Sequence, residues 1–591
     1  MAEKIAQRVC REMKTLKVFG DVHISLLLDQ QKGQPIVSSQ YFNAKEAAAL
    51  QGNIFNPTLA LQTIKNLNRR TITRTDWKNI GPRVGLSWNP SFDSGMLGQV
   101  LGDRKTVLRG GYSLVYDRMN ATNAGIESSL GAFYQGLATT GPVNASGQPF
   151  RIGVDGATPL PTVPVETLPY APSIPFGLLF AVLENPTNTI GRAHLLDVTI
   201  QRELPSRFFL EVGYVGRLGR NLRMDTTLNA VPYFMVDSQS KQSFAKAYDA
   251  VAKQLRAGVS VTSITAQPWF ENYLSAVATG CGGGTVNATQ CLALQDSGDF
   301  INGGLSSLWQ TNMDIIRLLN GQPTELNLQT IDPIVRVGDT NSNYNALFLS
   351  VHRQMSRGFT FDVNYTFSRS MDDAGNTQDN GQGFSSPFTP QLDYDVSQFD
   401  RTHVLNAHWY EELPFGAGRH FSTGKRLDKL VGGWYTAGIV TANSGLPLCP
   451  IYGSGAFGGG LIIAPPNCGV PIADINPGNS IHGLGANRNL FTAPQLVLAN
   501  YRQILISQDT RNPRGTLRGL PAWQLDLSAG KITNLTERFR LVFSADLINA
   551  LNHPLFGDPT LDMTSPETFG SIPITERNSP RLVQLALRLE F

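Results

Sequence analysis

Apolar and polar residues alternate most clearly in the last eleven residues of the chain. Here Val583, Leu585, Leu587, Leu589 and Phe591 share one parity, and mostly polar residues occupy the other. Successive side chains of an extended chain point to opposite faces, so this pattern predicts a strand with one apolar face. That face could pack on a soluble core, or it could face lipid around a polar lumen.

The same two-faced pattern recurs along the chain. Residues 359–368 place three Phe, one Val and one Tyr on one face and only polar side chains on the other. Residues 539–549 separate Phe, Leu and Ala from Arg, Val, Ser and Asp in the same way. Few soluble strands separate so cleanly, which favours strands that face lipid. The other predicted strands are 83–88, 106–116, 195–203, 208–215, 344–353, 403–413, 434–441 and 523–529, with 22–28 as a weaker candidate and 44–51 as a helix.

The connections between these strands alternate in length. Counted back from the C-terminus, long loops such as 216–343 and 445–522 alternate with short or moderate connections, such as the turns near Ser356 and Thr533. Outer-membrane barrels have short periplasmic turns and long extracellular loops, whereas a soluble sandwich has no reason to keep this parity. We therefore predict an all-β fold, a partial antiparallel transmembrane β-barrel of about twelve strands with long extracellular loops. Residues 22–28 would supply the strand that makes the count even.

The composition agrees with a protein of strands and loops. Of 591 residues, 57 are Gly and 35 are Pro, 16% are charged, and the net charge is +3. Lys and Arg form no long run, so nothing indicates a nucleic-acid surface. The strongest apolar run, 176–183, is far too short to cross a bilayer as a helix. A membrane-spanning form of this chain must therefore cross with strands.

The first twenty residues carry several Lys and Arg without an apolar segment. They therefore do not have the pattern of a secretory signal peptide. Because an outer-membrane protein needs an export signal, we expect either that the true N-terminus lies upstream of this sequence or that the protein is cytosolic and the barrel interpretation is wrong.

Four of the five cysteines lie in predicted extracellular loops. Cys281 and Cys291 share one loop, and Cys449 and Cys468 share another. Close pairs in exposed loops predict disulfides formed in an oxidising compartment. The alternative is free or metal-binding thiols, but no Cys-x-x-Cys spacing and no nearby His supports zinc.

No motif for catalysis or cofactor binding stands out. Residues 453–458 fit Gly-x-Gly-x-x-Gly, but no helix is predicted after them to receive a pyrophosphate, so we attribute the match to chance. The chain has no His-Glu-x-x-His or Gly-x-Ser-x-Gly pattern. The acidic loop 371–400 could bind calcium, but its spacing is not that of an EF-hand, and a solvated loop is the simpler interpretation. We predict no enzyme, no cofactor and no metal. Aromatic residues near strand ends suggest membrane-interface girdles, with ordinary core residues as the alternative; they are Trp88, Tyr116, Tyr365, Trp409, Trp434 and Trp523.

Several stretches between about residues 79 and 591 resemble one family. They are NIGPRVGLSWNP, KTVLRGGYSLVYDR, IQRELPSRFFLEVGYVG, YNALFLSVHRQMSRGFTFDVNYTFSRSMDD, FDRTHVLNAHWYEELPFGAGR, LVGGWYTAGIVTANSGLPL and ADLINALNHPLFGDP. These resemble the C-terminal barrel portion of TonB-dependent outer-membrane receptors, in the Oar-like subgroup that has a carboxypeptidase-regulatory-like N-terminal domain. The resemblance implies a barrel of about 22 strands closed by an N-terminal plug and energised by the TonB complex.

The resemblance also implies a function, a localisation and partners. We expect uptake of an unidentified oligosaccharide, peptide or chelate across the outer membrane of a diderm bacterium. Residues 1–78 would be an N-terminal segment with one strand and a loop or helix, and 79–591 the receptor-like barrel. The final alternating residues, ending on Phe591, would be the signal that the barrel-assembly machinery reads. Outer-membrane lipid is a further expected partner, and nucleic acid is not.

Departures from the family leave other functions open. We recognise no signal peptide, plug, regulatory-like domain or TonB box, so the TonB complex is expected to act only through a plug that this sequence lacks. No substrate-binding residue can be carried over. The alternative function is a passive pore or a surface-adhesion outer-membrane barrel. A secreted all-β carbohydrate-acting enzyme would need two carboxylates that converge on one cleft, and no motif supports it.

Overall fold

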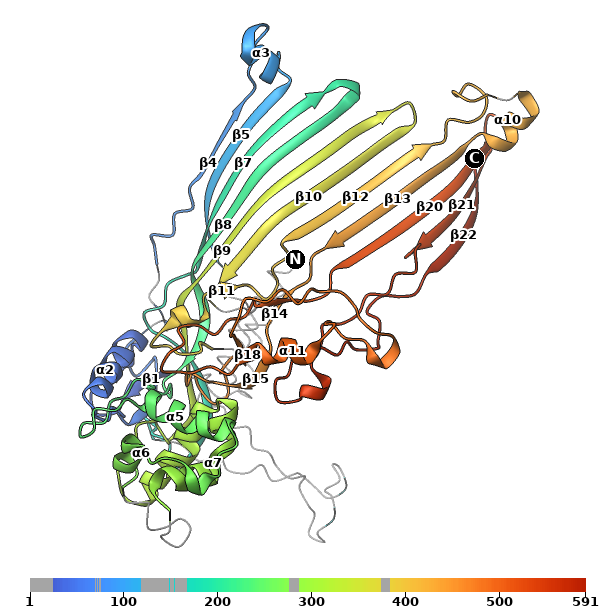
Figure 1. The fold of residues 1–591 in the computed structure, drawn as a ribbon. Coiled ribbons are helices and arrows are strands. Elements are labelled where there is room, and N and C mark those ends of the chain that lie inside the picture. Colours follow the sequence, from blue (N-terminus) through green and yellow to red (C-terminus); the bar gives the residue numbers. More distant parts are fainter. Residues whose placement is uncertain are drawn as a thin grey trace.

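One large β-sheet dominates the structure. The computed structural model describes residues 25–69, 71, 73, 76–117, 148, 154, 167–275, 286–373, 383–422 and 424–591. Within them, eleven strands follow one another across the sheet in sequence order, each antiparallel to the next, so the predicted antiparallel meander is confirmed. We call these eleven strands the wall (Figure 1). They are β4 (Arg83–Trp88), β5 (Thr106–Tyr116), β7 (Arg192–Leu204), β8 (Phe208–Thr227), β9 (Thr330–Ser356), β10 (Phe359–Asp372), β12 (His403–Glu412), β13 (Trp434–Asn443), β20 (Ala522–Asn534), β21 (Arg540–Ile548) and β22 (Leu582–Glu590).

The pairing register separates apolar from polar side chains across the wall. One row of directly paired residues, from β4 to β20, is apolar or aromatic throughout: Trp88, Leu108, Ile200, Val212, Leu349, Tyr365, Leu405, Ala442 and Trp523. The adjacent row, which points to the opposite face, is polar: Gln201, Glu211, Ser350, Asn364, Asn406, Thr441 and Gln524. The wall therefore has one apolar face and one polar face.

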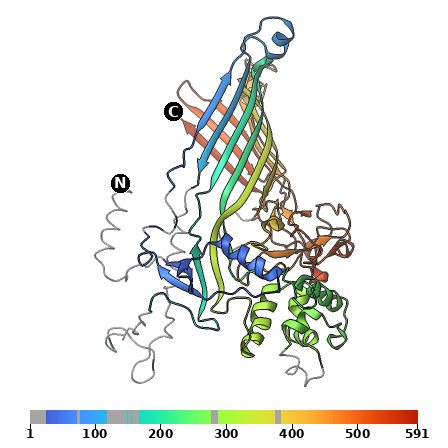
Figure 2. The same ribbon diagram turned by 90° about the vertical axis from the view of Figure 1, so that its left-hand side faces the viewer.

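Neither face of the wall is covered by another layer in the described part of the chain. Figures 1 and 2 show a single curved sheet, with helices only at its two ends. Apolar side chains such as Val198, Leu347 and Leu587 remain more than half exposed. A bare apolar face of this size is a liability in water but is satisfied by lipid. The outermost strands, β4 and β22, each pair on one side only, so the described wall is an open arc of a barrel.

The connections sort to two ends of the wall. The short turns 205–207, 357–358 and 535–539 lie at the same end as the C-terminus. The same end carries two short helices, α3 (Gly95–Leu101) and α10 (Lys425–Val431). The long connections gather at the opposite end, so the alternation predicted from the sequence is confirmed. We call the two ends the turn end and the loop end.

The strand predicted at 22–28 as the twelfth of the wall is not part of it. Its described residues belong to β1, which pairs in a separate small sheet at the loop end. Leu26, Leu27 and Leu28 are all buried, so β1 is covered on both faces and lacks the alternation of a wall strand. The prediction of a twelfth wall strand is therefore wrong. The elements of this N-terminal unit are β1 (Ser25–Asp29), β2 (Gln34–Pro35), α2 (Ser38–Leu50), which contains most of the predicted helix, and β3 (Leu59–Thr63).

Two wall strands are much longer than a strand needs to be to cross a membrane. β8 has 20 residues and β9 has 27, whereas a transmembrane strand needs roughly 9–11. Their pairing extends to Thr227 and Ile334 at the loop end, where β6 (Leu178–Glu184) joins β9 in parallel. The apolar run noted at 176–183 therefore lies largely in a strand. At the end of β10, the short strand β11 (Asp395–Val396) pairs with it.

A helical unit occupies most of the connection from β8 to β9. We predicted only a long loop here, because Gly, Asn, Ser and Gln are frequent. Apolar residues such as Phe244, Tyr248, Val251 and Leu255 nevertheless recur at helical spacing and are buried. The elements are α5 (Phe244–Arg256), η2 (Val261–Ser263), α6 (Pro268–Tyr273), α7 (Ala288–Asn302), α8 (Leu305–Ser307), η4 (Leu308–Met313) and α9 (Asp314–Leu319). Among the described residues, no helix is both long and apolar enough to cross a membrane.

A second loop unit forms where the connections β13–β20 and β21–β22 pack together. Its core joins Leu490, Phe491 and Leu517 of the first connection to Phe556 and Phe569 of the second. Its elements are β14 (Pro447–Leu448), β15 (Ile451–Ser454), β16 (Pro466–Cys468), β17 (Val470–Pro471), η6 (Gly485–Asn487), α11 (Pro494–Ala499), β18 (Tyr501–Arg502), β19 (Leu517–Arg518) and η7 (Pro566–Thr568); η5 (Pro390–Asp393) lies in the β10–β12 connection.

Candidate functional site

The candidate site is the body formed by the long connections, which we call the outer cap. It consists of the described residues in 25–69, 167–191, 228–329, 383–402, 444–521 and 549–581. Four buried apolar clusters lie in it or at its junction with β6, β8 and β9. The outer cap is therefore a folded body rather than a set of separate loops. In outer-membrane barrels the long loops face outward, where ligands first arrive.

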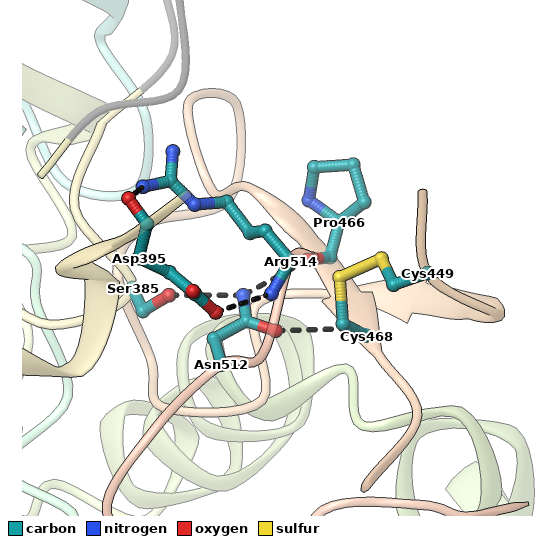
Figure 3. Close-up of a disulfide and its surroundings, with 7 residues drawn as sticks. All are labelled: Ser385, Asp395, Cys449, Pro466, Cys468, Asn512 and Arg514. Carbon is teal, nitrogen blue, oxygen red and sulfur yellow. Dashed lines mark hydrogen bonds between the residues drawn. A yellow bond between two sulfur atoms is a disulfide. The ribbon is translucent and has the colours of Figure 1, made fainter. Parts of the chain in front are cut away.

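A disulfide and an asparagine hold one part of the outer cap together (Figure 3). Cys449 and Cys468 are bonded, with their Cα atoms 5.5 Å apart. The Cys468 backbone N–H donates to Asn512 Oδ1 over 2.9 Å. Asn512 Nδ2 in turn donates to Ser385 Oγ and to the carbonyl oxygen of Pro466. One buried amide thus links two separate connections, which fixes the position of the disulfide relative to the β10–β12 loop.

Arg514 extends this link to the end of the wall. Its guanidinium Nη2 donates to Asp372 Oδ1 over 3.0 Å and to the Asp393 carbonyl oxygen over 2.7 Å. Its backbone N–H donates to Asp395 Oδ2 over 3.0 Å. These hydrogen bonds come from a charged donor, and such bonds are stronger than those between neutral groups. Arg514 therefore ties the β13–β20 connection to the last residue of β10.

The described part of the acidic loop 371–400 is not the solvated loop that we predicted. Asp372, Asp373, Asp393 and Asp400 are all buried, and each accepts hydrogen bonds from neighbouring segments. Burial raises the pKa of the Asp393 carboxyl to about 6. The sequence suggested solvation because the partners Ser385, Arg514 and Arg518 are distant or inconspicuous in the chain. Asn376, Asp379 and Asn380 lie outside the described residues.

A second buried polar cluster attaches the N-terminal unit to the helical unit. Lys45 of α2 is fully buried and lies 3.7 Å from the Glu325 carboxylate, and its Nζ donates to the Glu325 carbonyl oxygen. Asp314 accepts from the backbone N–H groups of Glu325 and Leu326 and from the Tyr273 hydroxyl. Burial raises the pKa of Glu325 and lowers that of Lys45. Sequence reasoning did not find this cluster, because no local pattern joins residues 45 and 325.

Two adjoining hollows lie on the second loop unit. They have volumes of about 240 and 400 Å³ and share Ile475. Apolar side chains including Leu496 and Phe491 line the smaller hollow together with the amides of Asn476 and Asn500. Ile472, Asp474 and Tyr501 are among the residues that line the larger one. A surface that combines apolar side chains with amides suits a ligand that is itself partly apolar and partly polar.

The final strand lies at the edge of the wall. The residues predicted as an assembly signal, Val583, Leu585, Leu587 and Leu589, pair with apolar residues of β21 and share the apolar face. All four are more than half exposed, and Phe591 is 94% exposed. Their placement fits a strand that faces lipid.

The six aromatic residues noted near strand ends occupy the same face of the wall. Trp88, Tyr365 and Trp523 belong to the apolar row described above, and Tyr116, Trp409 and Trp434 have the same parity in their strands. Trp434 begins β13 at the turn end, and Trp523 lies near the start of β20 at the loop end. This arrangement agrees with a membrane-interface girdle and not with core residues.

The remaining sequence features lead to no chemical site among the described residues. Cys281 lies outside the described residues, so its pairing with Cys291 stays a prediction. Residues 453–458 begin in the last two residues of β15 and continue without entering a helix, and Phe457 is part of the apolar core. Within the part of the chain that the structure describes, no group of three or more His, Cys, Asp or Glu side chains could hold a metal ion.

Comparison with known proteins identifies a family. A family model described as "Outer membrane beta barrel domain" matches residues 32–584. No curated protein matches. Similar solved structures include the outer membrane transporter YddB from Escherichia coli, at 8% identity and a TM-score of 0.37, covering 90% of this chain and 42% of that one. The pyoverdine receptor FpvA from Pseudomonas aeruginosa, at 8% identity and a TM-score of 0.31, covers 86% and 36%. The siderophore receptor PiuA from Acinetobacter baumannii, at 7% identity and a TM-score of 0.31, covers 85% and 35%.

This chain spans less than half the length of each of these three proteins. The family model extends over nearly the whole chain, including the wall and the outer cap. Its description agrees with a meander of strands that has one apolar and one polar face. The chain belongs to the family of outer-membrane β-barrel domains.

Proposed function

We propose that this chain is the barrel portion of a TonB-dependent receptor and that its outer cap binds the ligand that the complete receptor imports. The observation that carries the proposal is the folded outer cap at the loop end. A passive pore needs no body with several buried cores and cross-links such as Arg514 above its opening. A receptor does, because a ligand site requires side chains held in fixed positions.

The hollows beside Ile475 are the proposed contact surface for the ligand. They combine apolar side chains with amide groups, and Leu496 is 69% exposed at their rim. A compact chelate, a peptide or an oligosaccharide with an apolar patch would match this lining. Ligand binding would begin here because the loop end faces the outside of the cell.

Three partners belong to the proposal. Outer-membrane lipid would cover the apolar face of the wall. The barrel-assembly machinery would recognise β22 and Phe591 during insertion. The TonB complex would supply energy through a plug domain of the complete receptor.

Surface adhesion is the second candidate function. It is favoured by the arm formed by β8 and β9, which carries the helical unit well beyond the span that a membrane requires. In that case the helical unit, and not the hollows beside Ile475, would make the decisive contacts.

The test is to express the chain behind a signal peptide in hosts with and without a working TonB system. Whole cells of both hosts should retain a radiolabelled ligand from a panel of ferric chelates, peptides and oligosaccharides. Leu496→Asp should reduce retention at least tenfold, whereas Leu484→Asp, at an exposed Leu of the same unit outside the hollows, should not. Leakage of every small solute without retention of any ligand would support a passive pore and contradict the proposal. Adhesion to cells or surfaces that survives Leu496→Asp would favour the second function.

A further inference from the structure

Two short helices at the turn end expose large apolar side chains. On α3, Met96 is 81% and Val100 is 58% exposed, and on α10, Leu427 is 56% and Leu430 is 69% exposed. The helices lie in different hairpins, α3 between β4 and β5 at one edge of the wall and α10 between β12 and β13 well away from that edge (Figure 1). Neither helix belongs to a buried apolar cluster of the described residues. Within the described part of the chain, nothing covers these side chains.

Side chains on the apolar face of the wall hold α3 in place through hydrogen bonds. Arg202 of β7 donates from Nη2 to the Gln99 carbonyl oxygen over 3.2 Å, and the Thr106 hydroxyl donates to the Leu101 carbonyl oxygen over 2.7 Å. Thr106 and Arg202 are directly paired, and Arg202 also pairs with Leu210 in the next strand. All three share the parity of the apolar row. The carbonyl oxygens at the C-terminal end of α3 are thus held by residues of the lipid-facing side.

Side chains on the apolar face of the wall also hold α10 through hydrogen bonds. Lys531 of β20 donates from Nζ to the carbonyl oxygens of Lys429 and Gly432 over 3.1 and 2.9 Å, and also to that of Leu430. Trp434 Nε1 donates to the Leu430 carbonyl oxygen over 3.2 Å. Trp434 and Lys531 are directly paired and share the parity of the apolar row. A cation from the apolar face therefore holds the C-terminal end of each helix, although the two hairpins share no sequence pattern.

The β12–β13 connection adds to this apolar surface. Phe415 and Phe421 are both more than two-fifths exposed and contact each other, with ring centroids 5.7 Å apart. The Lys531 Nζ lies 5.3 Å from the centre of the Trp434 ring. Aromatic rings, Lys and Arg at the edge of an apolar belt match the boundary between acyl chains and headgroups.

We propose that α3 and α10 are interfacial helices that insert their apolar side chains among the phospholipids of the periplasmic leaflet. Three observations support phospholipid as the partner that covers these side chains. The helices continue the lipid-facing surface of an outer-membrane wall, they are held by residues of that surface, and they stand at the turn end, which faces the periplasm in this family. The two helices would set the depth of the wall in the membrane at two separate points.

The proposal can be tested with a fluorescent label of known depth. In a Cys10→Ser background, single cysteines replace Met96 or Leu427, and an environment-sensitive dye is attached to each. The full chain is inserted into vesicles of phosphatidylethanolamine and phosphatidylglycerol that contain lipids with a nitroxide near the headgroup. Labels at Gln99→Cys and Lys429→Cys, which replace polar residues of the same helices, are the matched controls. Labels at Val198 in the wall and Leu484 in the outer cap mark the lipid and water limits.

The nitroxide lipid should quench the labels at Met96 and Leu427 at least twofold more than those at Gln99, Lys429 and Leu484. Lys531→Met should lower the quenching at Leu427 at least twofold and leave the quenching at Met96 unchanged. Arg202→Met should lower the quenching at Met96 at least twofold and leave that at Leu427 unchanged. Quenching at Met96 and Leu427 no greater than at Leu484 would overturn the proposal. The proposal would also be overturned if neither aqueous iodide nor the nitroxide lipid quenched these labels. In that case another protein or a second copy of the chain would cover the helices.

Discussion

The wall and the outer cap bury their apolar side chains in different ways. Leu347 is 54% exposed although its strand lies well inside the sheet, whereas Leu308 in the outer cap is fully buried. Wall residues have neighbours only within one layer, so their apolar face depends on lipid. Outer-cap residues surround one another. The comparison shows that one chain contains a part that the membrane stabilises and a part that its own core stabilises.

Polar residues differ between the two regions as well. On the polar face of the wall, Asn364 is exposed and Ser350 is half-buried, so both remain open to solvent. In the outer cap, Lys45, Asp314 and Glu325 are buried and depend on one another. Buried charges that lose a partner carry a large penalty, whereas exposed polar groups are hydrated by water instead. Single substitutions should therefore damage the outer cap more than the polar face of the wall.

The largest effect is expected at Lys45. Lys45→Met leaves the Glu325 carboxylate buried beside Asp314 without its cation, and should lower the free energy of unfolding of the outer cap by about 3–5 kcal/mol. Near-ultraviolet circular dichroism of denaturant unfolding would measure this, because buried Trp and Tyr residues such as Trp309 and Tyr248 lie in the outer cap. The double variant Lys45→Met, Glu325→Met should recover most of the loss. Equal losses in the single and double variants would contradict a role for the ion pair.

The second prediction compares one substitution in both regions. Leu308→Ala opens a cavity in the helical unit and should cost about 2–5 kcal/mol. Leu347→Ala removes the same atoms from a lipid-facing position and should cost less than about 1 kcal/mol in detergent micelles, which fill the space left behind. Heat-modifiable gel mobility would report the wall, and near-ultraviolet circular dichroism the outer cap. Similar losses at both positions would mean that the wall has a packed partner.

Much of the wall could be predicted from the sequence because its signal is local. Alternation within 359–368 and 539–549 directly gives the strand and its two faces, and the lengths of the connections give the topology. The predicted strands 83–88 and 106–116 agree with β4 and β5 at both ends. The error at 22–28 arose because three consecutive Leu residues can form a strand that is buried on both sides, and membership of the wall then depends on pairing that the sequence does not show.

The outer cap could not be predicted to the same extent because its signals are distant in the chain. Lys45 and Glu325, or Arg514 and Asp372, become neighbours only after folding. Acidic residues in a Gly-rich loop look solvated until their partners are known. The amphipathic spacing in α5 could have been recognised from the sequence. We predicted a loop there instead, because Gly, Asn, Ser and Gln are frequent in this connection.

The third prediction uses the two faces of one strand. Leu349→Arg places a charge on the apolar face and should cost about 2–4 kcal/mol when the chain is in a bilayer. Ser350→Arg places the same charge on the polar face one residue later and should be nearly neutral. Folded yield in phospholipid vesicles, measured by gel mobility without heating, would compare them. Equal yields would contradict the assignment of the faces.

The fourth prediction concerns pH and the outer cap. Burial raises the pKa of Asp393 to about 6, above the usual value of about 3.9 in an unfolded chain. The folded state therefore holds the proton more tightly, so this group stabilises the outer cap below pH 4 and loses that contribution as the pH rises through about 6. The loss should be at most about 3 kcal/mol. Asp393→Asn should flatten the dependence of the unfolding midpoint between pH 4 and 7, whereas Asp474→Asn, at an exposed position, should leave it unchanged.

The smallest effect on stability, and the sharpest test of the wall, is expected at the last two residues. Glu590 pairs with Arg540 across the final hairpin, over 2.7 Å to its Nε, whereas Phe591 is almost fully exposed. If the finished structure decided the outcome, Glu590→Ser would be the more harmful change. If the assembly machinery reads the terminal apolar residue, Phe591→Ser should reduce the heat-modifiable barrel several-fold, and Glu590→Ser should not. Each variant would be expressed behind a signal peptide and compared with the same variant folded from urea into vesicles without the machinery. A deficit of Phe591→Ser in cells that disappears in vesicles would assign the effect to recognition, whereas an equal deficit in both would assign it to the edge of the wall itself.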